Sequence, residues 1–195
     1  MESIVDKLKN RIVHDAIIIK PNIINVSTFL NHQVDVIFMN ELADIFIKQF
    51  SRKNIDKIVT IEASGIIPAG FVALKLGVPL IYAKKKVPST LGSDVYQRVV
   101  YSMTRGENVM ITVSKRFLNS GDNVLIIDDF LAKGGTAKGL IAILKEASVN
   151  IVGFGVIIEK TFEGGRKNIE SENIDFYSIV KVKSIENGIE FEQFT

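Results

Sequence analysis

Short apolar segments of strand character alternate with segments of helical periodicity along most of the chain, and this alternation is the strongest limit on its fold. The expected strands are 57–63, 79–84, 123–127 and 151–158, and the expected helices are 65–76 and 136–147. Such alternation builds βαβ units with right-handed crossovers. The sequence therefore predicts an α/β fold with a mostly parallel sheet flanked by helices, and ligands bind such sheets at the carboxyl ends of the strands.

The remaining segments extend this pattern. Residues 2–13 and 34–46 carry apolar residues at helical spacing, which predicts two amphipathic helices. Residues 17–31 are apolar but irregular. Alternating residues in 94–115 predict a hairpin, and the segment FYSIVKVKSIENGIEFEQF predicts two strands joined by a turn at Glu186–Gly188.

Length and composition are those of one ordinary soluble domain. The 195 residues contain no repeat or flexible linker, so a single domain spanning 1–195 is expected. No run approaches the about 18 uninterrupted apolar residues of a membrane span, and the charged N-terminus lacks the apolar region of a signal peptide. The absence of cysteine and a net charge of +2 are compatible with a cytoplasmic protein without a nucleic-acid or membrane partner.

The stretch VLIIDDFLAKGGTAKG, residues 124–139, combines the features of a ligand site. Asp128 and Asp129 follow a buried strand, and a glycine-rich turn then opens into a helix. The free amides and the dipole at the start of that helix suit a phosphate. Carboxylates repel a bare phosphate, but they accept hydrogen bonds from vicinal hydroxyls. A ribose 5-phosphate satisfies both requirements.

Each half of this stretch also has an ordinary structural reading, as a tight turn or as a solvated strand end. Two better-known motifs do not fit. The ATP-type phosphate loop requires Lys at the position of Leu140, and a response-regulator receiver lacks the glycine turn directly behind its acids. The two halves in this order favour a ligand site.

The stretch resembles the phosphoribosyl diphosphate (PRPP) signature of type I phosphoribosyltransferases. The rest of the chain is similar to one branch of that family, the xanthine phosphoribosyltransferases of low-GC Gram-positive bacteria. The segments that carry this likeness are FLNHQVD (29–35), KIVTIEASGIIPA (57–69), LIIDDFLA (125–132) and VIIEKTFEGGR (156–166). The resemblance implies transfer of phosphoribose from PRPP to xanthine, giving xanthosine 5′-monophosphate (XMP) and pyrophosphate.

The resemblance also implies residue roles at the PRPP site. Asp128 and Asp129 would act as the catalytic acids that hold the ribose hydroxyls. The 5-phosphate would bind the turn formed by Ala132, Lys133, Gly134, Gly135 and Thr136. Pyrophosphate would bind Ala63 and Ser64, in a loop that often contains a non-proline cis peptide, together with Lys85. Mg²⁺ is expected to arrive with PRPP rather than in a carboxylate cage.

For the purine, the resemblance implies a hood built from about 15–35 and the C-terminal segment. The matching positions are Ile24, Asn31, Phe130 and Lys160, and Lys160 would donate to an oxo group and could favour a purine anion. The hairpin would be a mobile catalytic loop with Tyr101, Ser102 and Thr104 near its tip. Ala132 stands where hypoxanthine-guanine relatives carry an Asp base, so we expect no dedicated side-chain base.

Two other functions stay open at this stage. A PRPP-binding regulator of the same fold would bind the substrate without turnover. An adenine phosphoribosyltransferase shares the DD-x-x-A-x-GGT core, although Asn31 and Lys160 argue against it. By resemblance the protein is a homodimer.

Overall fold

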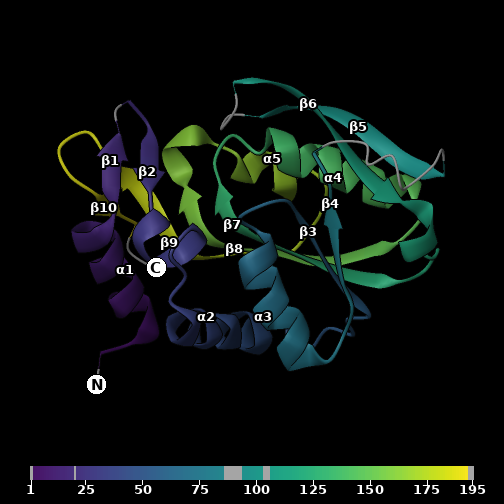
Figure 1. Cartoon of the computed structure of the whole chain (residues 1–195), viewed down its shortest axis with the longest axis horizontal. Coiled ribbons are helices and arrows are strands. Elements are labelled where there is room, and N and C mark those ends of the chain that lie inside the picture. The colour runs from purple at the N-terminus through teal and green to yellow at the C-terminus, as the bar shows by residue number, and fades with distance from the viewer. Residues whose placement is uncertain (1, 20, 86–93, 103–105, 193–195) are drawn as a thin grey trace.

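The computed structural model describes residues 2–19, 21–85, 94–102 and 106–192. Six strands form its central sheet: β3 (Lys57–Ile61), β4 (Leu80–Ala83), β7 (Asn123–Leu131), β8 (Asn150–Lys160), β9 (Phe176–Ser184) and β10 (Glu190–Phe191). Their order is β10-β9-β8-β7-β3-β4, and all neighbours are parallel except β10, which is antiparallel to β9. The predicted α/β fold with a mostly parallel sheet is confirmed (Figure 1).

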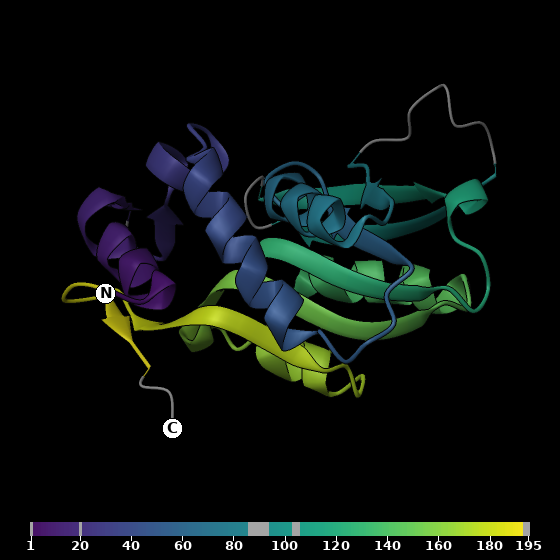
Figure 2. The ribbon, with the colours of Figure 1, turned by 90° about the horizontal axis from the view of Figure 1, so that it is seen from below.

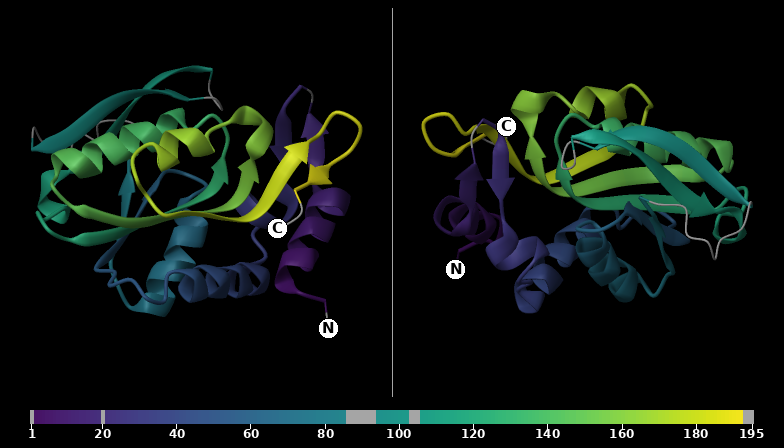
Figure 3. Two further views of the ribbon diagram at one scale, coloured as in Figure 1. Left: turned by 180° about the vertical axis from the view of Figure 1, so that it is seen from behind. Right: turned by 45° about the horizontal axis from the view of Figure 1, so that its top comes forward.

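Helical layers cover both faces of this sheet (Figure 3). One layer contains α2 (Val36–Gln49) and α3 (Ile66–Leu76), and the other contains α4 (Gly135–Glu146) and α5 (Arg166–Glu170). Successive strand residues point into opposite layers, as the pleat requires. Ile58 packs in the core on the α2 and α3 side, whereas Val59 packs in the core on the α4 side. Burial on both faces explains why the central strands read as continuous apolar runs.

The predicted hairpin forms a separate two-stranded antiparallel sheet of β5 (Val95–Ser102) and β6 (Glu107–Ser114). It lies over α4 (Figure 3). Gly139 makes this approach possible, because a side chain there would collide with Val100. A single bridge between Lys84 and Thr112 connects the hairpin to the edge of the main sheet.

The N-terminal region is more regular than its sequence suggests. Helix α1 (Ile4–Asp15) is followed by a short hairpin of β1 (Ile17–Ile19) and β2 (Ile23–Asn25) and by a π-helical turn, Ser27–Asn31. Arg11 fastens α1 to this region by stacking on Phe29 and pairing with Asp35 at 2.6 Å. Figure 2 shows α1 beside β10, so the first helix and the last strand lie at the same end of the sheet.

Two strands are longer than predicted. β7 continues through the paired acids to Leu131, and β8 continues to Lys160, because their parallel pairing extends past Asp128 and Val156. The acids therefore lie inside the end of a strand rather than after it. Helix α5, with only five residues, was not predicted. None of the described helices is long and apolar enough to cross a membrane.

The strand order identifies the edge where a ligand would bind. β3 has β4 on one side and β7 on the other, so the chain changes direction across the sheet at the β3–β7 pair. In open parallel sheets the crevice at such a switch point is the usual ligand site. The carboxyl ends of β3 and β7 carry Glu62–Gly65 and the paired acids, which brings two of the predicted binding segments together.

Candidate active site

The paired acids form the centre of the site. Asp129 is only 6% exposed, and its backbone N–H donates to Oδ1 of Asp128 over 2.9 Å. Burial raises the pKa of the Asp128 carboxyl well above its usual value, and the adjacent charge of Asp129 raises it further. The Asp128 carboxyl therefore retains its proton more readily than an exposed carboxyl would. A ligand that brings hydroxyl donors or positive charge offsets this repulsion.

The glycine turn follows directly and begins α4. Gly134 has a φ of 77°, in the left-handed region that glycine adopts without strain, and it is the residue before the first helical turn. The amides at this helix start have no partner within the helix, and they are the groups predicted to bind an anion. Lys133 is exposed, and its carbonyl accepts a hydrogen bond of 2.9 Å from the side chain of Asn168 in α5.

The backbone at Gly165, just before α5, packs against the glycine turn Ala132–Thr136, which is called the phosphate turn below. A Cβ atom added to Gly165 would overlap the carbonyl oxygen of Ala132 and lie 2.9 Å from the amide nitrogen of Gly134. Two backbone segments therefore touch at this point, and only glycine fits between them. Gly165 belongs to the segment VIIEKTFEGGR, but nothing in that sequence reveals which residue meets the phosphate turn.

The loop after β3 faces the acids from the neighbouring strand. Its Glu62–Ala63 peptide bond is cis, as the resemblance implied. Oε1 of Glu62 accepts a hydrogen bond of 2.5 Å from the backbone N–H of Lys85, which joins this loop to the end of β4. Ser64 and Lys85 line the same cavity as the acids, whereas Ala63 is exposed and is not among its lining residues.

Gly65 packs directly against the paired acids. We expect Gly65→Ala to lower kcat/KM by about tenfold to a hundredfold, because a small displacement of a reacting group is costly. A Cβ atom there would overlap the Asp128 carboxylate and the hydroxyl of Thr60. Gly70→Ala in α3 is the matched control, because its Cβ would meet only Leu80, at 4.0 Å. Steady-state kinetics of both variants test this, and equal activity of the two would contradict it.

Two adjoining cavities make up the site, with volumes of about 150 and 440 Å³. They share four lining residues: Ser64, Asp129, Phe130 and Ala132. The smaller cavity continues along Lys85 and the glycine turn through Thr136. The larger one extends under the N-terminal hairpin. A ligand with a phosphorylated sugar and a flat ring would span both, with Asp129 at the junction.

The larger cavity contains all four residues predicted to meet the purine: Ile24, Asn31, Phe130 and Lys160. Asn31 also donates to Oδ2 of Asp129 over 3.2 Å, so it connects the N-terminal region to the acids. Lys160 donates to the carbonyl of Asn22 over 3.0 Å. It also forms an ion pair with Glu163, a residue that the sequence did not single out.

The residues predicted for the mobile loop are only partly described. Tyr101 is half-exposed and lines the smaller cavity at the end of β5. Ser102 is the last residue of that strand, and Thr104 lies outside the described residues. Tyr101, at the end of β5, therefore lies beside the acids, and the predicted role of this loop stays a prediction.

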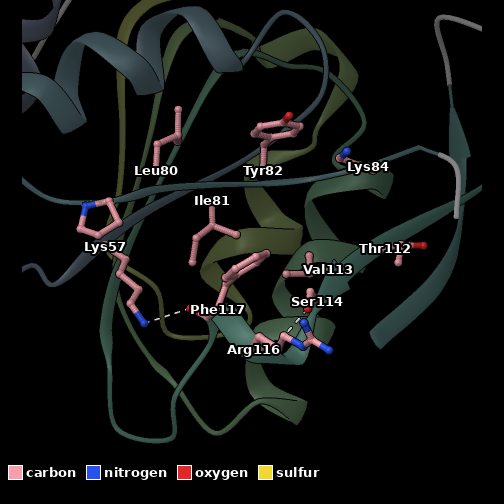
Figure 4. A pocket seen from close by; sticks show the side chains of 11 residues that line it. Lys57, Leu80, Ile81, Tyr82, Lys84, Thr112, Val113, Ser114, Arg116 and Phe117 are labelled. Atoms are coloured by element: carbon pink, nitrogen blue, oxygen red, sulfur yellow. Dashed lines mark hydrogen bonds between the residues drawn. The ribbon is translucent and has the colours of Figure 1, made fainter. Parts of the chain in front are cut away.

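A third cavity, of about 540 Å³, lies between β4 and β6 and shares no lining residue with the other two. Figure 4 shows Tyr82, Phe117 and Arg116 around it, together with Lys57, which donates to the carbonyl of Phe117 over 2.9 Å. Its lining contains neither a carboxylate nor a glycine turn. We therefore place the candidate active site at the two adjoining cavities.

Comparison with known proteins agrees with this geometry. The phosphoribosyl transferase domain family matches residues 25–193, and the chain belongs to that family. The chain is 43% identical to a xanthine phosphoribosyltransferase of Lactobacillus acidophilus, over 95% of this chain and 97% of that protein. It is 42% identical to one of Pseudomonas entomophila, over 94% and 97%. The likeness therefore extends beyond the low-GC Gram-positive bacteria.

Solved structures with the same fold include adenine phosphoribosyltransferases. One from Giardia lamblia has a TM-score of 0.79 and 26% identity, covering 94% of this chain and all of that chain. One from Rhodothermus marinus has a TM-score of 0.76 and 23% identity, covering 92% and 98%. At this identity the likeness supports the fold and does not identify the base.

Proposed function

We propose that this protein transfers the phosphoribosyl group of PRPP to xanthine, forming XMP and pyrophosphate. The observation that carries the proposal is the junction at Asp129, where a cavity with a glycine phosphate turn meets a second cavity that contains Lys160 and Asn31. Xanthine phosphoribosyltransferases at 40–43% identity over nearly the whole chain support the choice of base.

The chemistry is displacement of pyrophosphate from the anomeric carbon by a ring nitrogen of the purine. The 5-phosphate binds the amides of Ala132–Thr136, and the ribose hydroxyls donate to Asp128 and Asp129. These carboxylates stabilise positive charge that develops on the sugar, while Ser64 and Lys85 meet the leaving pyrophosphate. Tyr101, which lines this cavity at the end of β5, would limit the access of water to the sugar.

Mg²⁺ would enter with PRPP and offset the negative charge of its diphosphate. No group of three acidic or histidine side chains among the described residues is placed to hold a metal ion. The two carboxylates at the ribose and the loop at Ser64 are compatible with an ion that keeps mostly diphosphate and water oxygens as ligands. Ala132 cannot act as a base. The purine therefore loses its proton either by ionising before the reaction or by releasing it to water.

The assignment of Lys160 leads to a direct test. Lys160→Ala is expected to lower kcat/KM for xanthine by about tenfold to a hundredfold, the usual value of a hydrogen bond from a charged donor. Lys167→Ala, an exposed lysine of α5, should leave kcat/KM unchanged. Lys160→Ala also leaves the buried Glu163 without its partner. Thermal unfolding of both variants shows whether a loss of stability explains the loss of activity. An unaltered preference for oxopurines in Lys160→Ala would contradict the assignment.

Turnover separates this function from its rivals. Purified protein is incubated with PRPP, Mg²⁺ and one purine at a time, and nucleotide and pyrophosphate are quantified. We expect both products with xanthine. PRPP binding without product would favour a regulator, and product with adenine alone would favour an adenine phosphoribosyltransferase.

We further propose a cytoplasmic homodimer whose purine site is covered by a hood of residues about 15–35 and the C-terminal segment. The hydrogen bonds from Asn31 to Asp129 and from Lys160 to Asn22 support the hood, because both join the N-terminal region to the site. Sedimentation of the purified protein tests the dimer.

A further inference from the structure

The phosphate turn (Ala132–Thr136) is held by a side chain from another helix. Nδ2 of Asn168 in α5 donates to the carbonyl oxygen of Lys133 over 2.9 Å. The approach is close, because a Cβ atom added to Gly134 would lie only 3.4 Å from the same Nδ2. Lys133 and Gly134 line the smaller cavity of the site, whereas Asn168 does not. Asn168 therefore contacts the phosphate turn from outside the cavity in which the anion is predicted to bind.

This hydrogen bond fixes a peptide group that the bonds within α4 do not reach. The carbonyl of Gly134 accepts from the N–H of Lys138 over 2.9 Å, so the first turn of α4 orients the peptide that follows Gly134. The carbonyl of Lys133 lies one peptide earlier, before the left-handed φ of 77° at Gly134. The carbonyl and the following N–H of a planar trans peptide point in opposite directions. A Lys133 carbonyl held toward Asn168 therefore turns the N–H of Gly134 away from Asn168.

Asn168 is itself held in place by the sheet. Its backbone N–H donates to the carbonyl of Gly165 over 3.0 Å. Arg166, the first residue of α5, donates through Nε to the buried carboxylate of Glu159 in β8 over 2.8 Å. Ser178 of β9 donates to the same carboxylate over 2.6 Å. These bonds anchor α5 to two neighbouring strands, so the side chain of Asn168 extends from a fixed backbone.

We propose that Asn168 is a positioning residue for the 5-phosphate of PRPP. It acts through the peptide between Lys133 and Gly134, which it orients so that the N–H of Gly134 donates to the phosphate. This inference rests on the part of the proposed function in which the phosphate turn binds the 5-phosphate. Without the bond from Asn168 this peptide rotates more freely, and the phosphate has to order it on binding, which weakens the affinity.

Calorimetry with two fragments of PRPP tests this role. Ribose 5-phosphate carries only the 5-phosphate, and pyrophosphate, given with Mg²⁺, carries only the diphosphate. In Asn168→Ala we expect the Kd of ribose 5-phosphate to rise about threefold to tenfold, the usual value of one hydrogen bond, and the Kd of pyrophosphate to stay unchanged. Asn168→Asp keeps the size of the side chain but places an acceptor against the carbonyl of Lys133, so the rise should exceed about tenfold.

Asn150→Ala is the matched control. Nδ2 of Asn150, the first residue of β8, donates to the carbonyl of Gly121 over 3.1 Å, so this variant loses the same kind of bond. Neither residue lines the two adjoining cavities, and both Kd values should stay unchanged. In turnover, Asn168→Ala should raise the KM for PRPP and leave the KM for xanthine unaltered.

The possible outcomes separate the inference from the proposed function. If the unaltered protein binds ribose 5-phosphate but forms no XMP, the proposed function fails, and the two Kd values still test Asn168. An unaltered Kd of ribose 5-phosphate in both Asn168 variants would overturn the inference. Equal losses for ribose 5-phosphate and pyrophosphate would also overturn it, because Asn168 would then support the fold in general. A protein that binds neither fragment lacks the phosphate site, and both proposals fail.

Discussion

Asp128→Asn is expected to lower kcat about a hundredfold or more and at the same time to stabilise the folded protein at neutral pH. The loss of activity follows from removal of a carboxylate that faces the developing sugar cation, and single electrostatic groups of this kind are worth about 10²–10³ in kcat. The gain in stability follows from burial of Asp128 beside Asp129, which raises the Asp128 pKa. Function and stability therefore oppose each other at this residue.

The sign of the stability change depends on pH. With the folded-state pKa of Asp128 raised, the folded protein keeps a proton that the unfolded chain has already released, and the free energy of unfolding falls as pH rises through that window. Asn does not ionise, so in Asp128→Asn this fall in the free energy of unfolding does not occur. We expect Asp128→Asn to unfold at a Tm about 2–4 °C higher at pH 7, or about 1 kcal/mol. Below the pKa of an unfolded Asp the difference should vanish.

Thermal unfolding at several pH values measures this effect. Asp44→Asn is a suitable control, because Asp44 is an exposed partner of Lys75 and should show no such gain. A lower Tm for Asp128→Asn than for the unaltered protein at pH 7 would show that the buried carboxylate is stabilised by contacts that the structure does not contain.

Gly165→Ala should produce the second large effect, a KM for PRPP that rises about tenfold to a hundredfold, as expected for displacement of a binding group by about 1 Å. Gly165 has a φ of −63°, so alanine adopts its backbone conformation without strain. The conflict is steric, because the new methyl group would overlap the carbonyl oxygen of Ala132. The phosphate turn is backbone, and it can relieve the overlap only by moving.

Steady-state kinetics with varied PRPP, and direct PRPP binding, measure this displacement. Gly70→Ala introduces the same methyl group into a helix where it has room, and its KM for PRPP should not change. An unaltered KM in Gly165→Ala would mean that the glycine turn does not bind the phosphate, or that Gly165 does not set the position of that turn.

The sheet could be predicted from the sequence, and the candidate PRPP-binding residues could be singled out, because the signals of both are local. The strand, acids and glycine turn of residues 124–139 are consecutive, so their order alone indicates the chemistry. The sequence predicts that this strand ends at Ile127, because the chain becomes polar at Asp128. Pairing with β8 instead continues β7 to Leu131. Three-residue strands such as β1 and β2 leave too short a pattern to recognise.

The purine half was less predictable because long-range contacts create it. Nothing around Glu163 in the sequence indicates that its side chain is 4% exposed or that it faces Lys160. The burial of Glu163 depends on a turn fixed by Arg166, Glu159 and Ser178, which come from different strands and a five-residue helix. The shape and charge of this cavity therefore depend on contacts that the linear sequence does not reveal.

The fold and the base preference are separate questions for this chain. Adenine phosphoribosyltransferases share its architecture at TM-scores of 0.76 and 0.79, so the fold alone does not determine the base. We propose that the preference for an oxopurine over adenine depends on Asn31 and Lys160, which line one cavity under the N-terminal hairpin.

The most direct test of the account is a competition between bases. The protein is given limiting PRPP, Mg²⁺ and an equimolar mixture of xanthine, guanine, hypoxanthine and adenine, and the nucleotides formed are separated and quantified over time. We predict that XMP is the main product and that AMP is nearly absent. A mixture dominated by AMP would contradict the roles given to Lys160 and Asn31, and the absence of any nucleotide would contradict the proposed transferase activity.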